Sequence, residues 1–161
     1  MLCYDNSQML IRPIHLMPNH KPLILTSPKQ RQGSRFEQQA CEYLQTQGLR
    51  LVVQNWQKPK VGELDLVMIE TGLAWSTLVF IEVRQRKSSN YGDAALSVTA
   101  SKQRKVIKTA QSFLQQYPEY AHYDCRFDVI AYNTMSKLNS RNEELDHQPE
   151  WIQNAFIASA W

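Results

Sequence analysis

Two stretches are the most informative about the fold of this chain: Gly62-Glu63-Leu64-Asp65-Leu66-Val67 and Phe80-Ile81-Glu82-Val83-Arg84-Gln85-Arg86. Both are typical of β-strands, yet each carries acids where an apolar side chain would be easier to bury. Strand side chains alternate between faces, so Glu63 and Asp65 share a face of one strand, and Glu82 and Arg84 share a face of the other. If the strands are neighbours, three carboxylates and a guanidinium converge. Clustered, partly buried carboxylates repel one another, so a divalent cation or a cationic partner is the natural compensation.

The rest of the sequence predicts an α/β domain with a central mixed sheet flanked by helices, in the order α-β-β-β-α-β. Apolar residues at helical spacing predict helices over about residues 33–47 and 99–117. We expect strands over residues 49–56, 63–70, 73–86 and 125–133, and a short closing segment over 151–156. In the second strand, we expect Leu64, Leu66 and Met68 to share one face. A buried ion pair on one face is expected for Arg126 and Asp128, which lie two residues apart in an apolar strand.

Domain organisation follows from composition. Residues 1–32 are rich in proline and lack periodicity, so we expect a flexible tail there, a domain over 33–157 and a short end over 158–161. A misassigned start codon is an alternative explanation of the tail, because Met9 and Met17 lie within it. No apolar run approaches the roughly 18–20 residues that span a bilayer. The three cysteines form no Cys-x-x-Cys pair, which argues against a disulfide framework and a zinc site. We therefore expect a cytoplasmic protein that does not associate with membranes.

Positive charge is concentrated directly after the acidic strands. Between residues 84 and 108 the only acid is Asp93, against Arg84, Arg86, Lys87, Lys102, Arg104, Lys105 and Lys108. A solvated helix face is the ordinary explanation of such a run. Its position beside clustered acids favours a polyanionic ligand instead. Lys102 and Gln103 begin the second helix, where a helix N-terminus also attracts phosphate.

Several acids have a plain structural alternative. Asp65 and Glu82 could form ion pairs with Arg84 and Arg86, and Glu37 could be a solvated helix residue. Glu63 could be exposed or could cap the strand turn.

Five motifs occur in the same order, and at nearly the same spacing, as in one family of proteins: Gly33-x-x-x-Glu37-x-x-Ala40, Gly62-Glu63-Leu64-Asp65, Phe80-Ile81-Glu82-Val83-Arg84, Lys102-Gln103 and Arg126-Phe127-Asp128. On these motifs the chain resembles the YraN family of small bacterial proteins, over about residues 33–157. That family is similar to the restriction-endonuclease-like PD-(D/E)XK nucleases, especially archaeal Holliday-junction resolvases. The resemblance implies a restriction-endonuclease-like fold with a metal-dependent active site.

Carried over residue by residue, the resemblance implies a catalytic set of Glu37, Asp65, Glu82 and Arg84. Asp65 and Glu82 would bind Mg²⁺ or Mn²⁺, which prefer hard oxygen ligands. Apart from the resemblance, Glu63 is expected to support this pair because it shares a strand face with Asp65. Arg84 stands where the nucleases have lysine. Arginine stays protonated, so it can stabilise anionic charge but cannot act as a base.

The expected function is therefore nucleic-acid binding with metal-dependent cleavage of branched or single-stranded DNA, in DNA processing or recombination. The alternative is a catalytically weak or inactive DNA-binding module that recruits a DNA-processing partner. RNA is a third, less favoured ligand, and a homodimer is left open. The residues expected to contact nucleic acid are Arg84, Arg86, Lys87, Lys102, Gln103, Arg104, Lys105 and Lys108.

Overall fold

The computed structural model describes residues 28–86, 98–133 and 149–158. The chain forms α1 (Pro28–Thr46), β1 (Arg50–Lys58), β2 (Gly62–Thr71), β3 (Ser76–Arg86), α2 (Ala100–Gln116), a 3-10 turn (Pro118–Tyr120), β4 (Asp124–Asn133) and β5 (Glu150–Phe156). Most of the predicted tail and of the end after residue 157 lies outside the described residues.

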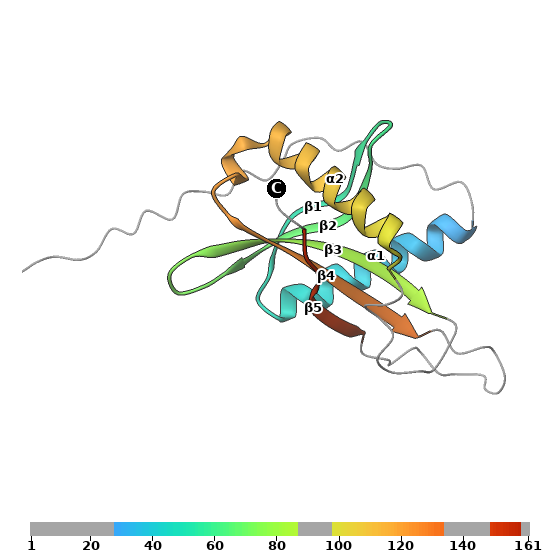
Figure 1. Cartoon of the computed structure of the whole chain (residues 1–161). Helices are drawn as coiled ribbons and strands as arrows, with labels where there is room; N and C mark the ends of the chain where they lie inside the picture. The colour runs from blue at the N-terminus through green and yellow to red at the C-terminus, as the bar shows by residue number, and fades with distance from the viewer. Residues whose placement is uncertain (1–27, 87–97, 134–148, 159–161) are drawn as a thin grey trace, which may run out of the picture.

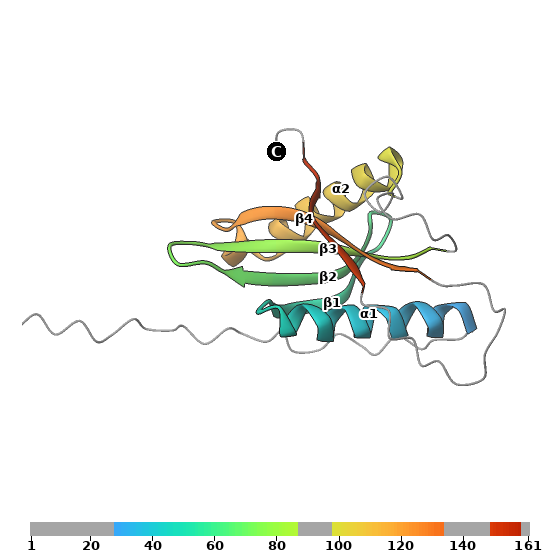
Figure 2. The same ribbon diagram turned by 90° about the horizontal axis from the view of Figure 1, so that it is seen from below.

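The five strands form one mixed sheet in the spatial order β1-β2-β3-β4-β5 (Figure 1). Neighbours are antiparallel except β3 and β4, which are parallel and are connected through α2. Figure 2 shows α1 and α2 on opposite faces of the sheet. The predicted mixed sheet with flanking helices is therefore confirmed.

Each helix covers its own hydrophobic core. On the α2 face, Phe113 packs edge-on against Trp56 and Phe80, with ring centroids 5.3 and 6.0 Å apart. On the α1 face, Phe36 and Leu44 pack with Ile81, which points away from Phe80 as strand alternation requires. Both helices bury the apolar stripes that their 3.6-residue periodicity predicts.

The structure differs from the expectations, or adds to them, in three details. First, α1 begins at Pro28, inside the predicted tail, because proline is well suited to the first turn of a helix. Second, the closing segment is a strand: β5 adds to the edge of the sheet beside β4. Third, Leu64 does not share a face with Leu66 and Met68; it lies in the α2-side core, whereas those two lie in the α1-side core. The alternation of β2 breaks at Asp65, where the sheet opens.

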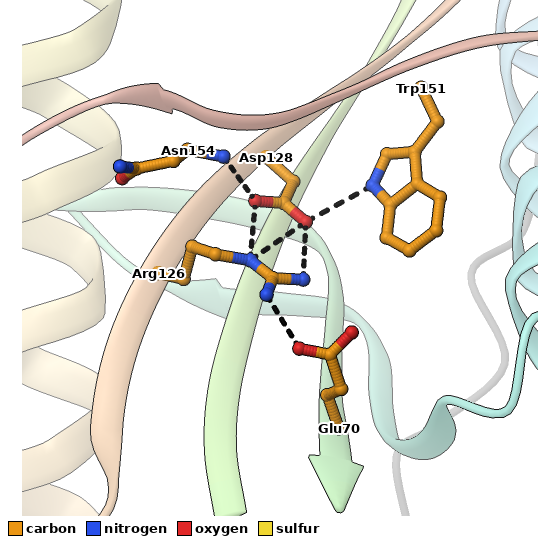
Figure 3. Close-up of polar contacts among 5 residues, drawn as sticks. All are labelled: Glu70, Arg126, Asp128, Trp151 and Asn154. Atoms are coloured by element: carbon orange, nitrogen blue, oxygen red, sulfur yellow. Dashed lines mark hydrogen bonds and ion pairs between the residues drawn. The ribbon is translucent and has the colours of Figure 1, made fainter. Parts of the chain in front are cut away.

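A buried ion pair attaches β5, as Figure 3 shows. Asp128 is fully buried and accepts hydrogen bonds from Arg126 Nε at 2.9 Å, Trp151 Nε1 at 3.1 Å and the Asn154 backbone N–H at 2.9 Å. Asn154 has a φ of 52°, and the β4–β5 register shifts beside it, so Asp128 satisfies a donor that a regular ladder would use. Arg126 also pairs with Glu70 of β2. The predicted Arg126–Asp128 pair is confirmed, and it links β2, β4 and β5.

Among the described residues, no helix combines the length and apolar character needed to cross a lipid bilayer.

Candidate functional site

The sheet forks beside the acidic residues. β2 and β3 are paired from Thr71 opposite Ser76 to Leu66 opposite Ile81, and there their pairing ends. Before Leu66, β2 stays with β1 and forms a hairpin, whereas β3 continues beside β4 to Arg86. Figure 1 shows the β1–β2 hairpin turning toward α2 while the ends of β3 and β4 run the other way. Such a fork releases backbone hydrogen-bonding groups that need new partners.

Asp65 lies at the branch point and supplies one such partner. Its Oδ2 accepts a hydrogen bond from the Val83 backbone N–H at 2.8 Å. Burial, and then the nearby negative charge of Glu82, raise the pKa of Asp65 to about 8, although the Val83 N–H and the Lys102 ammonium act in the opposite direction. Without a further cation, Asp65 therefore holds a proton at neutral pH.

Glu82 lies next to Asp65 and is neutralised by two cations. Its side chain is only 4% exposed, and Oε1 lies 3.0 Å from Lys102 Nζ and 3.5 Å from Arg84 Nε. The ion pair that the sequence left open as a structural alternative thus exists for Glu82 with Arg84. Lys102 comes from the first turn of α2, where its backbone N–H is capped by the Thr99 hydroxyl at 3.3 Å. The helix start therefore holds the Lys102 ammonium over the acids.

Glu37 reaches the same site from α1. Burial and the charges of Glu63 and Glu82 raise the pKa of Glu37, and a hydrogen bond from the Asn55 side chain lowers it. Glu37 is thus partly buried near the other acids rather than a fully solvated helix residue. Glu63 is exposed, on the hairpin side of the fork.

Asn55 is a site residue that the sequence reading missed. It lies in β1 between the paired positions Gln54 opposite Leu66 and Trp56 opposite Leu64, so it faces Asp65 across the hairpin. Its φ is 55°, a left-handed conformation that asparagine tolerates better than most residues. The available signal was a polar residue inside the apolar strand Leu-Val-Val-Gln-Asn-Trp.

The residues expected to contact nucleic acid differ in their hydrogen-bond partners and in their exposure to solvent. The Nε of Arg84 is buried without a hydrogen-bond partner within the described part of the chain, although about a third of the side chain is exposed. Gln103 donates from Nε2 to the Val98 carbonyl at 2.9 Å and so supports the start of α2. Three other basic residues of α2 are exposed: Arg104, Lys105 and Lys108. The Arg86 side chain and Lys87 lie outside the residues described.

The acids fit a magnesium or manganese ion as a pair and not as a complete cage. Within residues 28–86, 98–133 and 149–158, no three Asp, Glu, His or Cys side chains gather closely enough to hold a metal ion by themselves. Mg²⁺ is commonly held by one or two carboxylates together with several waters. Asp65 and Glu82 supply such a pair. Burial, and then the negative charge of Glu82, raise the pKa of Asp65, and a bound cation would offset both effects.

Comparison with known proteins adds a family. The sequence profile described as "Uncharacterised protein family UPF0102" matches residues 36–132, which include the whole fork. A UPF0102 protein of Psychrobacter cryohalolentis is 67% identical over 172 residues and covers 100% of both chains. Others from Pseudomonas fluorescens and Acinetobacter baylyi are 45% and 37% identical, covering 77% and 87% of this chain and 91% and 99% of their own. The chain therefore belongs to the UPF0102 family, which is the YraN family that its motifs resemble.

Proposed function

We propose that this protein binds DNA at the fork between β2 and β3 and cleaves it as a metal-dependent endonuclease with a restriction-endonuclease-like arrangement. One observation carries the proposal. Where the sheet opens, the Asp65 side chain accepts the Val83 N–H in place of a backbone carbonyl, and Asp65 therefore lies beside the buried Glu82. Buried acids of one sign are costly to stability and often mark a functional site.

Asp65 and Glu82 would hold a Mg²⁺ or Mn²⁺ ion, which supplies an activated water and neutralises the attacked phosphate. Glu37, held by Asn55, adds a third carboxylate near this pair. Arg84 presents a partly exposed guanidinium at the mouth of the site, where it can hold a phosphate oxygen.

Lys102 supplies the amine that Arg84 does not. In the nucleases that the family resembles, a lysine on the strand can position the attacking water. This chain has Arg84 at that place. The Lys102 ammonium lies 3.0 Å from Glu82 although it comes from α2 rather than from β3. We assign to Lys102 the role that the strand lysine has in related nucleases.

A second function is favoured by the same contacts. Lys102 and Arg84 already neutralise Glu82 without any metal, so the site can be stable as a binding surface with no hydrolytic step. In that case the protein is a DNA-binding module that recruits a processing partner. Branched or single-stranded DNA is the proposed ligand for both functions.

Titration with Mg²⁺ or Mn²⁺ against branched, single-stranded and duplex DNA, scored for both binding and cleavage, tests the proposal. The endonuclease should cleave at least one form. Lys102→Met should lose cleavage, whereas Arg84→Lys should retain or increase it. If wild type and Arg84→Lys bind DNA but cleave none of the three forms, the hydrolase is refuted and the binding module stands. If no form of DNA is bound, both functions fail.

A further inference from the structure

A concave pocket lies between the turn of the β1–β2 hairpin and α2, and neither Asp65 nor Glu82 lines it. The hairpin contributes Lys58, Lys60, Gly62 and Glu63 to its lining, and α2 contributes Lys105. Lys58 and Lys60 belong to the turn of the hairpin itself. Here they face a common space with a lysine from a distant part of the chain.

Gly62 makes the pocket possible. A Cβ at this position would lie 2.4 Å from Thr109 Oγ1 and 3.2 Å from Lys105 Cε. The Thr109 hydroxyl is buried and bonded to the Lys105 carbonyl at 2.7 Å, so it cannot easily move aside. Only glycine therefore lets the hairpin lie directly on α2, which brings Lys105 to the hairpin lysines.

Lys60 is held in an unfavourable backbone conformation. Its φ is 63°, and the Val61 N–H bonds to the Lys58 carbonyl at 3.0 Å, which closes a turn with Pro59 second and Lys60 third. Proline excludes positive φ at the second position, so this is a type II turn, whose third position favours glycine or asparagine. A lysine at this strained position points to a use for its side chain.

The pocket has an excess of positive charge. Three ammonium groups stand against the single carboxylate of Glu63, and among the described residues none of the three has an ion-pair partner within 4.0 Å. Lys58 has only a weak contact with Gln116 Oε1, at 3.4 Å. Unpaired ammonium groups around a concavity form a site for an anion with several acceptor oxygens.

We propose that this pocket binds an internal backbone phosphate of the nucleic-acid strand whose scissile phosphate lies at the fork. The inference rests on the proposed function and deepens it, because it states which path the bound strand follows over the protein surface. Glu63, on the pocket wall, is two residues from Asp65 along β2, or roughly 7 Å at strand rise. The strand therefore runs from Asp65 and Glu82 across the hairpin toward its turn, and Lys58, Lys60 and Lys105 hold it one or a few nucleotides from the cleaved bond.

Lys60→Gly provides a test in which the fold and the ligand respond in opposite directions. Glycine relieves the positive φ, so the unfolding midpoint should stay or rise, while one phosphate contact is lost. The probe is a single-stranded dodecanucleotide without terminal phosphates, in EDTA, with its affinity measured over a range of salt concentrations. The log–log salt slope should fall by about 0.7 for Lys60→Gly and by about twice that for Lys58→Gln/Lys60→Gln. Arg50→Gln, which removes an exposed charge at the other end of β1, is the matched control and should leave the slope unchanged.

Wild-type slopes in both lysine variants would overturn this inference while leaving DNA binding at the fork intact. No binding of the dodecanucleotide by the wild type, together with none of branched or duplex DNA, would overturn the proposed function along with it. A third arm measures inorganic phosphate alone by amide chemical shifts of Gly62 and Lys105. Saturation of these shifts by phosphate, with no change on adding the oligonucleotide, would assign the pocket to a free anion and refute a strand contact.

Discussion

Replacing Asp65 by asparagine should stabilise the protein, and the gain should depend on pH. Asparagine keeps an oxygen that can accept the Val83 N–H and removes the carboxyl group whose ionisation the site opposes. In the folded protein the pKa of Asp65 is raised to about 8, from an ordinary value of 3.8. Its stabilising contribution is therefore complete below about pH 4, where the carboxyl is protonated in both states. It is lost progressively as pH rises toward 8, because only the unfolded state can then ionise freely.

The slope of this loss is about 1.4 kcal/mol per pH unit for one fully shifted group. Between pH 5 and pH 7 the advantage of Asp65→Asn in free energy of unfolding should therefore grow by roughly 3 kcal/mol. For a domain of this size that is about 10 °C in Tm. Urea unfolding in EDTA at several pH values measures it. Glu63→Gln removes the same charge from an exposed neighbour on β2 and is the matched control, with no such growth expected.

A difference in stability between Asp65→Asn and wild type that stays constant from pH 5 to pH 8 would contradict this explanation. So would an equal gain in Glu63→Gln, because the effect would then come from general charge rather than from burial beside Glu82. With Mn²⁺ present, the wild type should regain stability and Asp65→Asn should not, since a ligand that binds only the folded state stabilises it. Calorimetry showing the same Mn²⁺ affinity for both proteins would sink the metal-site assignment.

Three further predictions concern the hairpin, the ion pair and the basic helix. Gly62→Ala should cost about 1–3 kcal/mol of stability because its methyl group would push the hairpin off α2. Gly33→Ala should instead stabilise the protein, because Gly33 lies inside α1 with its nearest neighbour 3.9 Å away. Chemical denaturation of both variants measures this, and equal effects would contradict the packing argument. Asp128→Ala should cost about 3–5 kcal/mol of stability because it leaves Arg126 buried without its main partner. The more exposed Glu70→Gln should cost under about 1 kcal/mol, and a loss that small for Asp128→Ala would show that Asp128 does not hold β5. Replacing Lys102, Arg104 and Lys105 together with alanine should weaken binding of all duplex sequences alike and reduce the salt slope by about 0.9 for each phosphate contact; an unchanged slope would mean that α2 does not face the nucleic acid.

Local patterns were sufficient to predict which face of the sheet each side chain of the central strand β3 occupies. Val79 and Ile81 face α1 while Leu78, Phe80 and Glu82 alternate to the other side, as period-two spacing predicts. The same reasoning failed one strand away, at Leu64, because β2 twists between Leu64 and Leu66 where its pairing with β3 ends. A break in alternation depends on a neighbouring strand, which the sequence of β2 does not contain.

The candidate site shows the same division. Which residues could carry charge into the sheet was predictable from local sequence, because acids at Asp65 and Glu82 interrupt apolar strands and Arg126 precedes Asp128 at strand spacing. Which of these residues come into contact depends on the folded arrangement of the strands and helices. It brought Asn55 opposite Asp65, Glu37 from α1 toward Glu82, and Lys102 to within 3.0 Å of the same carboxylate. These contacts join residues far apart in the chain, and they exist because the sheet forks and α2 crosses over it. Local periodicity determines burial, whereas the register between strands and the packing of helices determine which polar groups share a site.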